Sequence, residues 1–137
     1  MEIKEQLFYA YFAGCIDCDG TIGEIQHKTT KGFILNLTQH ERSGKEMTEI
    51  AEELRSYGYR VSLTTRVAWA EKSDVVMYNI NIKHTGTLIT LLQNLIPHLR
   101  FKKSKAESAL SFLLDKVEKM PITPPIPSKG VKRFWTK

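Results

Sequence analysis

The sequence predicts an α+β fold with the element order α-ββ-α-ββ-α-α, in which four antiparallel strands form one sheet with the helices on one face. An apolar helical stretch comes first, then two pairs of short alternating runs flank an amphipathic stretch, and two helical stripes follow. At 137 residues the chain is long enough for one domain with a core and too short for two.

The first helix is predicted by an apolar stretch near the N-terminus. From Leu7 to Ile16 every residue is apolar, small or tyrosine, so the helix is hydrophobic on all sides. Such a helix must be covered on more than one face. We therefore expect one face to pack on its own domain and another to contact a second helix, such as one from another subunit.

Two runs rich in β-branched residues, 21–28 and 32–39, predict a β-hairpin that turns at 29–31. The second run has a period of two, which gives the strand one apolar and one mostly polar face. Its two sets of alternating residues are Phe33, Leu35 and Leu37, and Ile34, Asn36 and Thr38.

An amphipathic helix is predicted next. Ser43 and Glu46 have the spacing of a capping box, and Gly58 is placed to end the helix. The apolar residues recur at i, i+3, i+4 and i+7, as Met47, Ile50, Ala51 and Leu54.

The runs 59–70 and 75–83 predict a second hairpin with its turn at 71–74. A leucine stripe then predicts a helix that Pro97 ends, and a final helix opens at Ser104 with Glu107 three residues later. We expect the final helix to direct inward Ala106, Leu110, Leu113, Leu114 and Val117.

Residues 1–120 are expected to form a single domain. All but one of the five prolines lie in residues 121–137, which we interpret as an extended, basic C-terminal tail. No stretch reaches the roughly 20 apolar residues of a membrane-spanning helix, and the N-terminus lacks the pattern of a secretion signal. We therefore expect an intracellular protein with no membrane partner.

Charge and cysteine content narrow the function classes. A formal net charge of +5 is typical of many nucleic-acid-binding domains, although it is not diagnostic. Cys15 and Cys18 form a lone C-x-x-C, so no tetrahedral zinc set is available. The pair lies inside the apolar helix and lacks the βαβ context of a redox motif.

Residues 12–21, FAGCIDCDGT, resemble the LAGLIDADG signature of homing endonucleases, with Phe for the first Leu and Cys at two further positions. The matching positions are Ala13, Gly14, Ile16, Asp17, Asp19 and Gly20. The predicted element order extends the resemblance over most of the chain. The resemblance implies the homing-endonuclease fold and a site-specific double-strand DNA endonuclease of the kind encoded in introns.

The resemblance also implies the active site. Asp19 matches the metal ligand, with the Cys18 carbonyl as a second ligand, and Lys102 matches the active-site lysine. Gln39 resembles the polar residue that positions water, and either Arg42 or Ser43 takes the neighbouring position. The implied cofactor is Mg²⁺ or another divalent cation such as Mn²⁺, which prefers oxygen ligands. The alternative is that Asp17 and Asp19 only cap a turn.

A homodimer is implied because the chain carries one signature. Ala13 and Gly14 are small enough to let two helix backbones approach closely. Two facing Asp19 carboxylates would repel, and a divalent cation would relieve that repulsion. The residues expected at the dimer interface are Phe12, Ala13, Gly14 and Asp17.

The polar sheet face is expected to bind double-stranded DNA, because a two-stranded ribbon fits the major groove. A homodimer would present this face twice and select a long, pseudo-palindromic site. The candidate contacts are Gln26, Lys28, Thr30, Asn36, Thr38, Arg60, Ser62, Thr64, Arg66, Asn79 and Asn81. Two alternatives remain open on the same fold: a maturase that binds intron RNA, and a DNA-binding regulator that does not cleave.

Overall fold

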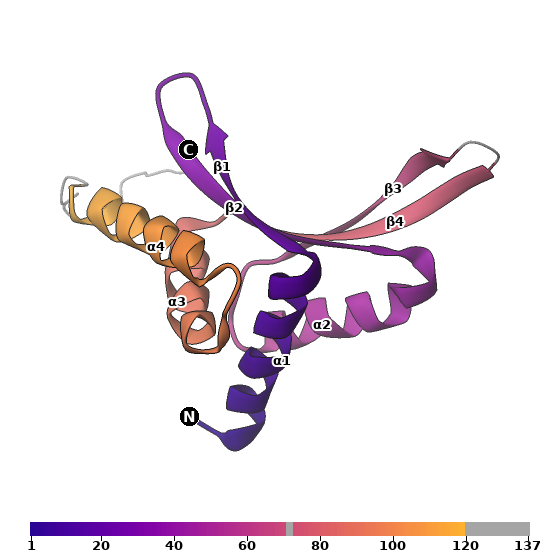
Figure 1. The fold of residues 1–137 in the computed structure, drawn as a ribbon, viewed down its shortest axis with the longest axis horizontal. Helices are drawn as coiled ribbons and strands as arrows, with labels where there is room; N and C mark the ends of the chain where they lie inside the picture. The colour runs from indigo at the N-terminus through magenta and orange to yellow at the C-terminus, as the bar shows by residue number, and fades with distance from the viewer. Residues whose placement is uncertain (71–72, 120–137) are drawn as a thin grey trace, which may run out of the picture.

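The computed structural model describes residues 1–70 and 73–119, and its element order is the predicted one (Figure 1). The strands are β1 (Gly20–Gln26), β2 (Lys31–His40), β3 (Ser62–Ala70) and β4 (Ser73–Ile82). The helices are α1 (Ile3–Asp19), α2 (Gly44–Ser56), α3 (Thr85–Leu95) and α4 (Lys103–Glu118), with 3₁₀ turns η1 (Glu41–Ser43) and η2 (Ile96–His98).

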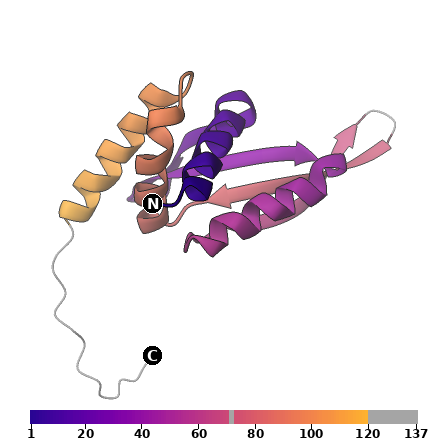
Figure 2. The same ribbon diagram turned by 90° about the horizontal axis from the view of Figure 1, so that it is seen from below.

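The four strands form one antiparallel sheet in the order β1-β2-β4-β3. Figure 1 shows the two hairpins diverging on either side of the sheet centre, and Figures 1 and 2 show the helices on one face. The other face is not covered by helices, as predicted, and Figure 1 shows that it is concave. No helix of the described residues is long and apolar enough to cross a membrane.

Helix α1 has two apolar faces, and the core covers only one of them. Its buried side chains are Phe8, Tyr9, Phe12, Ala13 and Ile16. Its exposed apolar side chains include Ile3, Leu7 and Tyr11, which are 74%, 66% and 57% exposed. The predicted second apolar face is therefore present and uncovered in the single chain.

The predicted capping box of α2 is wrong. The Ser43 side chain makes no capping hydrogen bond, because η1 precedes the helix and gives Ser43 a different backbone conformation. The Nδ1 atom of His40 accepts from the backbone N–H of Arg42 instead, at 3.0 Å. The helix ends as predicted, since Gly58 has φ +93° and follows its last turn.

Strand β3 begins at Ser62 and not at Tyr59, because tertiary hydrogen bonds hold the residues before it. The Tyr59 hydroxyl lies 2.7 Å from that of Tyr9, and the backbone N–H of Arg60 donates to Thr87 Oγ1 at 3.1 Å. The predicted turn at 71–74 partly falls on residues 71–72, outside the described residues.

Helix α4 begins at Lys103 and buries a narrower stripe than predicted. Ala106, Ala109 and Leu113 are buried, whereas Leu114 and Val117 are 43% and 44% exposed. The prediction that both point inward is wrong, because small residues one turn apart bring α4 close to α3 along a single edge. The predicted tail at 121–137 lies outside the described residues.

Gly20 connects α1 to β1 where no side chain fits. A Cβ atom there would lie 2.7 Å from the Ile16 Cα, which is backbone and cannot move aside. We expect Gly20→Ala to lower the free energy of unfolding by about 3 kcal/mol, at the upper end for overpacking. Denaturant unfolding measures this. Gly32→Ala, whose Cβ would meet nothing within 4 Å, is the control and should change stability by less than about 1 kcal/mol.

Candidate functional site

Asp19 and Gln39 lie side by side at the point where α1 enters the sheet. Asp19 is the last residue of α1, and its carboxylate is exposed. The β1–β2 register pairs Gly20 with Leu37, which brings the end of β2 back to the end of α1. The Nε2 atom of Gln39 donates to Asp19 Oδ2 at 3.1 Å. The structure therefore brings together two of the three predicted catalytic residues.

Lys102 joins the same region through the backbone of α1. Its Nζ atom donates to the Asp17 carbonyl at 2.7 Å, two residues before Asp19. The Asp17 carboxylate accepts from the backbone N–H groups of Arg100 at 2.7 Å and Lys102 at 3.0 Å. Asp17 is thus the anion that stabilises the N-terminal end of α4, where several cations crowd.

The hydrogen bonds of Asp17 also set its acidity. Burial raises the pKa of Asp17, but the backbone N–H groups of Arg100 and Lys102 and the charge of Lys102 lower it more, so the pKa lies below its usual value. The sequence identified Asp17 only as a candidate for an interface or a turn. Its actual partners lie more than 80 residues away, at Arg100 and Lys102.

We expect Asp17→Ala to lower the free energy of unfolding at pH 7 by about 1–2 kcal/mol, because two backbone donors lose a charged acceptor that is only partly buried. The pKa is lower in the folded chain, so this stabilisation is present at neutral pH. It is lost as the pH falls below about 4 and passes through the folded-state pKa.

Chemical unfolding of the wild type and Asp17→Ala at pH 7 and pH 3 measures that difference. The control is Asp115→Asn, which removes only an exposed ion pair with Lys119. If Asp17→Ala and Asp115→Asn lose equal stability at pH 7, Asp17 does not anchor the loop of residues 100–102 that precedes α4.

A cavity of about 220 Å³ opens beside Asp19 and Gln39, on the α2 side of α1. A second carboxylate, Glu46, lines it together with Ser43, one of the two candidates for the neighbouring site position. The remaining lining residues are Tyr11, Cys15, Leu37, Met47 and Ile50. Burial raises the pKa of the Cys15 thiol, so this thiol is largely uncharged at neutral pH.

The exposed Asp19 carboxylate is the kind of ligand that a hard divalent cation takes. Residues 1–70 and 73–119 contain no group of three or more His, Cys, Asp or Glu side chains that could hold a metal ion by themselves. Mg²⁺ commonly takes one or two carboxylates and fills its other positions with water and phosphate. Asp19 offers one such carboxylate, so other ligands would have to complete the site.

The predicted interface residues need correction. Phe12 and Ala13 are 0% exposed in the single chain, so they face their own core and have no surface for a second subunit. Asp17 is half-buried and bonds to its own loop. Gly14 is exposed, and a Cβ there would meet nothing within 4 Å.

The exposed face of α1 is a stripe at helical spacing. We call it the α1 stripe, and its members are Ile3, Leu7, Ala10, Gly14 and Cys18. A helix that is apolar all round gives no polar face by which the sequence could distinguish this stripe from the core side. Of the predicted interface residues, only Gly14 belongs to it.

The strand register places seven of the predicted DNA contacts on the open face of the sheet. Residues directly opposite one another in antiparallel strands share a face. Two rows cross the sheet, Asn36 with Asn81 and Ser62, and Thr38 with Asn79 and Thr64, and Arg66 lies further along β3.

The middle of this face is an internally hydrogen-bonded polar cluster. Asn36 Nδ2 donates to Asn81 Oδ1 at 2.7 Å, and Thr38 Oγ1 bonds to the side chains of Asn36 and Asn79. Asn79 is buried, with 7% exposed. Side chains nearer the β3 edge, Ser62, Thr64 and Arg66, are exposed and lack such partners among the described residues.

Four predicted contacts lie elsewhere. Gln26 pairs with Lys31, two residues before Phe33, so its strand position is on the helix side and its placement on the open face is wrong. Lys28 and Thr30 lie in the turn between β1 and β2. Arg60 precedes β3, yet it lines an open groove that also includes Ser62, Thr64, Asn81 and Lys83.

No protein-family model and no curated protein sequence matches this chain. Solved structures are similar to it. The homing endonuclease I-CvuI in complex with its target superimposes with a TM-score of 0.64 at 20% identity, over 86% of this chain and 72% of that chain. I-CvuI in complex with the I-CreI target, in the presence of Mg and with the DNA not cleaved, gives 0.63 at 19% identity with the same coverage.

A third structure is the LAGLIDADG meganuclease I-AabMI bound to uncleaved DNA. Its TM-score is 0.58 at 17% identity, and the match covers 81% of this chain and 38% of that chain. At these identities the likeness shows a common fold, which agrees with the predicted one.

Proposed function

Because the chain has the LAGLIDADG homing-endonuclease fold, we propose that it is a site-specific double-strand DNA endonuclease that acts as a homodimer with a divalent cation. One observation carries the proposal. The exposed Asp19 carboxylate, bonded by Gln39, ends the same helix that carries the uncovered α1 stripe. Two copies that meet along this stripe would bring their Asp19 carboxylates together.

The α1 stripe supports the dimer. Ile3 and Leu7 are 74% and 66% exposed, so their burial against a second helix would be favourable. Gly14 has no side chain, and a Cβ atom at its position would meet nothing within 4 Å, which permits close approach of a second backbone. A twofold axis makes the contact self-complementary, so one stripe serves as both halves of the interface.

The active site would combine a metal with positioning side chains. Asp19 from each copy and the Cys18 carbonyl would hold the cation, which supplies charge relief on the phosphate and activates water. Gln39 would orient water beside Asp19. Lys102 uses one of its three N–H donors on the Asp17 carbonyl and keeps two for a phosphate oxygen.

The open sheet face would bind the DNA. Its concave shape and the net charge of +5 suit a duplex, and its strands would lie in the major groove. Since the central Asn and Thr side chains bond to one another, we assign base reading to the exposed residues around them. These are Lys28, Thr30, Arg60, Ser62, Thr64 and Arg66.

Purified protein incubated with a randomised DNA library, with Mg²⁺ or with EDTA, tests the proposal when the cut ends are sequenced. We expect cut ends that form only with Mg²⁺ and that have a common sequence on either side of the cut. Selective retention of DNA without cutting would favour the regulator alternative. Selective binding of structured RNA without DNA cleavage would favour the maturase.

A further inference from the structure

Phe101 is an apolar side chain held in an exposed position. It is 82% exposed, the largest exposed fraction among the large hydrophobic residues of the described chain. Its two neighbours, Arg100 and Lys102, are each bonded through their backbone N–H groups to the Asp17 carboxylate. The loop is therefore fixed to the end of α1, and Phe101 is presented to solvent by an ordered backbone.

The cavity beside Asp19 is large enough to hold an aromatic ring. Its volume is about 220 Å³, whereas an apolar cavity of about 150 Å³ is known to bind benzene. Part of its lining is apolar or aromatic, from Tyr11, Leu37, Met47 and Ile50, and the largely uncharged Cys15 thiol also lines it. Within the described residues, no side chain of the same chain fills it.

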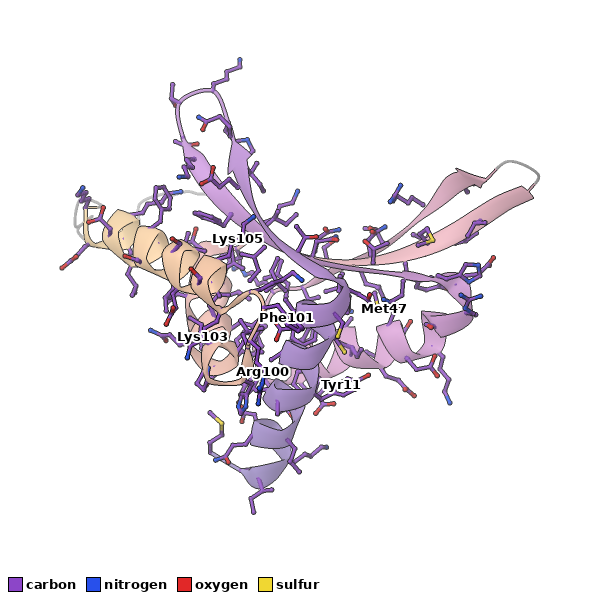
Figure 3. All side chains as sticks on the ribbon, viewed as in Figure 1. Tyr11, Met47, Arg100, Phe101, Lys103 and Lys105 are labelled. Carbon is purple, nitrogen blue, oxygen red and sulfur yellow. The ribbon has the colours of Figure 1, made fainter. Side chains whose placement is uncertain are left out.

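Phe101 and this cavity flank α1 on opposite sides. In Figure 3, Arg100 and Phe101 are labelled on one side of α1, and Tyr11 and Met47 on the other. The α1 stripe runs between these two flanks. A twofold axis along the stripe exchanges the flanks, so each copy would turn its Phe101 toward the other copy's cavity.

The charges around the two features are complementary. Arg100 and Lys103 are exposed cations beside Phe101. Glu46 lines the cavity, and Glu49 is exposed one turn further along α2, where it lies 4.0 Å from Lys45. Contact between copies would place the cations beside Phe101 near the Glu46 carboxylate at the cavity, which favours the correct register of association.

We propose that Phe101 of each copy inserts into the cavity of the second copy, which Tyr11, Cys15, Glu46, Met47 and Ile50 line. This contact rests on the proposed homodimer and adds a pair of anchors to the α1 stripe. The inserted ring would also cover the cavity next to Asp19 and Gln39 and exclude bulk water from that side of the carboxylate.

Disulfide trapping tests the contact with a thiol that the chain already has. In a Cys18→Ser background, Phe101→Cys would place a thiol beside the partner copy's Cys15. Mild oxidation is expected to give a covalent dimer, seen on non-reducing gels, that is lost when Cys15→Ala is added. No covalent dimer in a sample that sediments as a dimer, or one that persists without Cys15, would overturn the proposal.

Sedimentation equilibrium provides a second test that does not depend on cross-linking. We expect Phe101→Ser to raise the dimer dissociation constant about 100-fold, since each dimer loses two buried phenylalanines. Val117→Ser, which changes an exposed apolar residue of α4, is the matched control and should leave it unchanged.

The outcomes separate this contact from the function on which it rests. A wild-type chain that stays monomeric with and without target DNA overturns both the Phe101 contact and the proposed homodimeric endonuclease. A wild-type dimer whose dissociation constant is unaffected by Phe101→Ser overturns only the insertion of Phe101 and leaves the dimeric nuclease standing. Circular dichroism of each variant confirms that the monomer is folded.

Discussion

Asp19→Asn is expected to lower the rate of DNA cleavage by about a thousandfold or more, while DNA binding stays within a few-fold of the wild type. The substitution keeps the size of the side chain and an oxygen that can accept from Gln39 Nε2. It removes the negative charge that would hold the cation in each copy. Single-turnover cleavage with Mg²⁺, beside a binding assay with Ca²⁺, measures the two effects separately.

Asp115→Asn is the control for Asp19→Asn. Asp115 is an exposed carboxylate on α4, in a contact of 3.1 Å with Lys119, and it does not line the cavity beside Asp19. Its neutralisation changes the net charge by the same amount and should leave cleavage unchanged. Equal cleavage by the wild type and Asp19→Asn would show that the cation is not held by Asp19.

Gly14→Leu is expected to convert the dimer to a monomer without unfolding it. A Cβ at Gly14 meets nothing within 4 Å in the single chain, and replacing a helical glycine stabilises the helix by about 0.5–1 kcal/mol. At the α1 stripe, two leucines would hold the helices apart. We expect the dimer dissociation constant to rise about 100-fold or more. Overpacking costs about 1–3 kcal/mol, and the twofold axis places one substituted side chain from each copy in the interface.

Analytical ultracentrifugation and thermal unfolding together test Gly14→Leu. Ser111→Leu adds the same side chain to an exposed position of α4 and should leave self-association unchanged. A Gly14→Leu variant that still dimerises with the wild-type dissociation constant would place the interface elsewhere. A variant that fails to fold would contradict the free space seen around Gly14.

Hydrophobic periodicity was sufficient to predict the order of the elements and the polar face of the sheet. Periodicity did not predict the features that depend on tertiary contacts, such as which side chains of α1 face the core. Leu7 and Phe12 are equally apolar, so nothing in an all-apolar helix marked which one faces the core. Gln26 was assigned to the wrong face because Ile22 and Ile25 lie on opposite faces of β1, so its apolar residues do not show which face is buried.

The candidate site was predicted in part. The signature identified Asp19, and the family resemblance identified Gln39 at the end of the second strand. In the structure Gln39 Nε2 lies 3.1 Å from Asp19 Oδ2. The contacts of Asp17 and the exposed position of Phe101 were not predicted, because Asp17 bonds to a loop 83 residues away and Phe101 lies in that loop. Local patterns carry no signal for contacts between segments so distant in sequence.

Mapping the cut positions on both strands of a selected site tests the central claim most directly. A homodimer with one Asp19 in each copy is expected to make one Mg²⁺-dependent cut per strand, at positions related by the twofold axis of the site. The experiment requires an end-labelled duplex and a sequencing ladder. Cuts on one strand only, or positions without twofold symmetry, would contradict a dimeric endonuclease built on the α1 stripe.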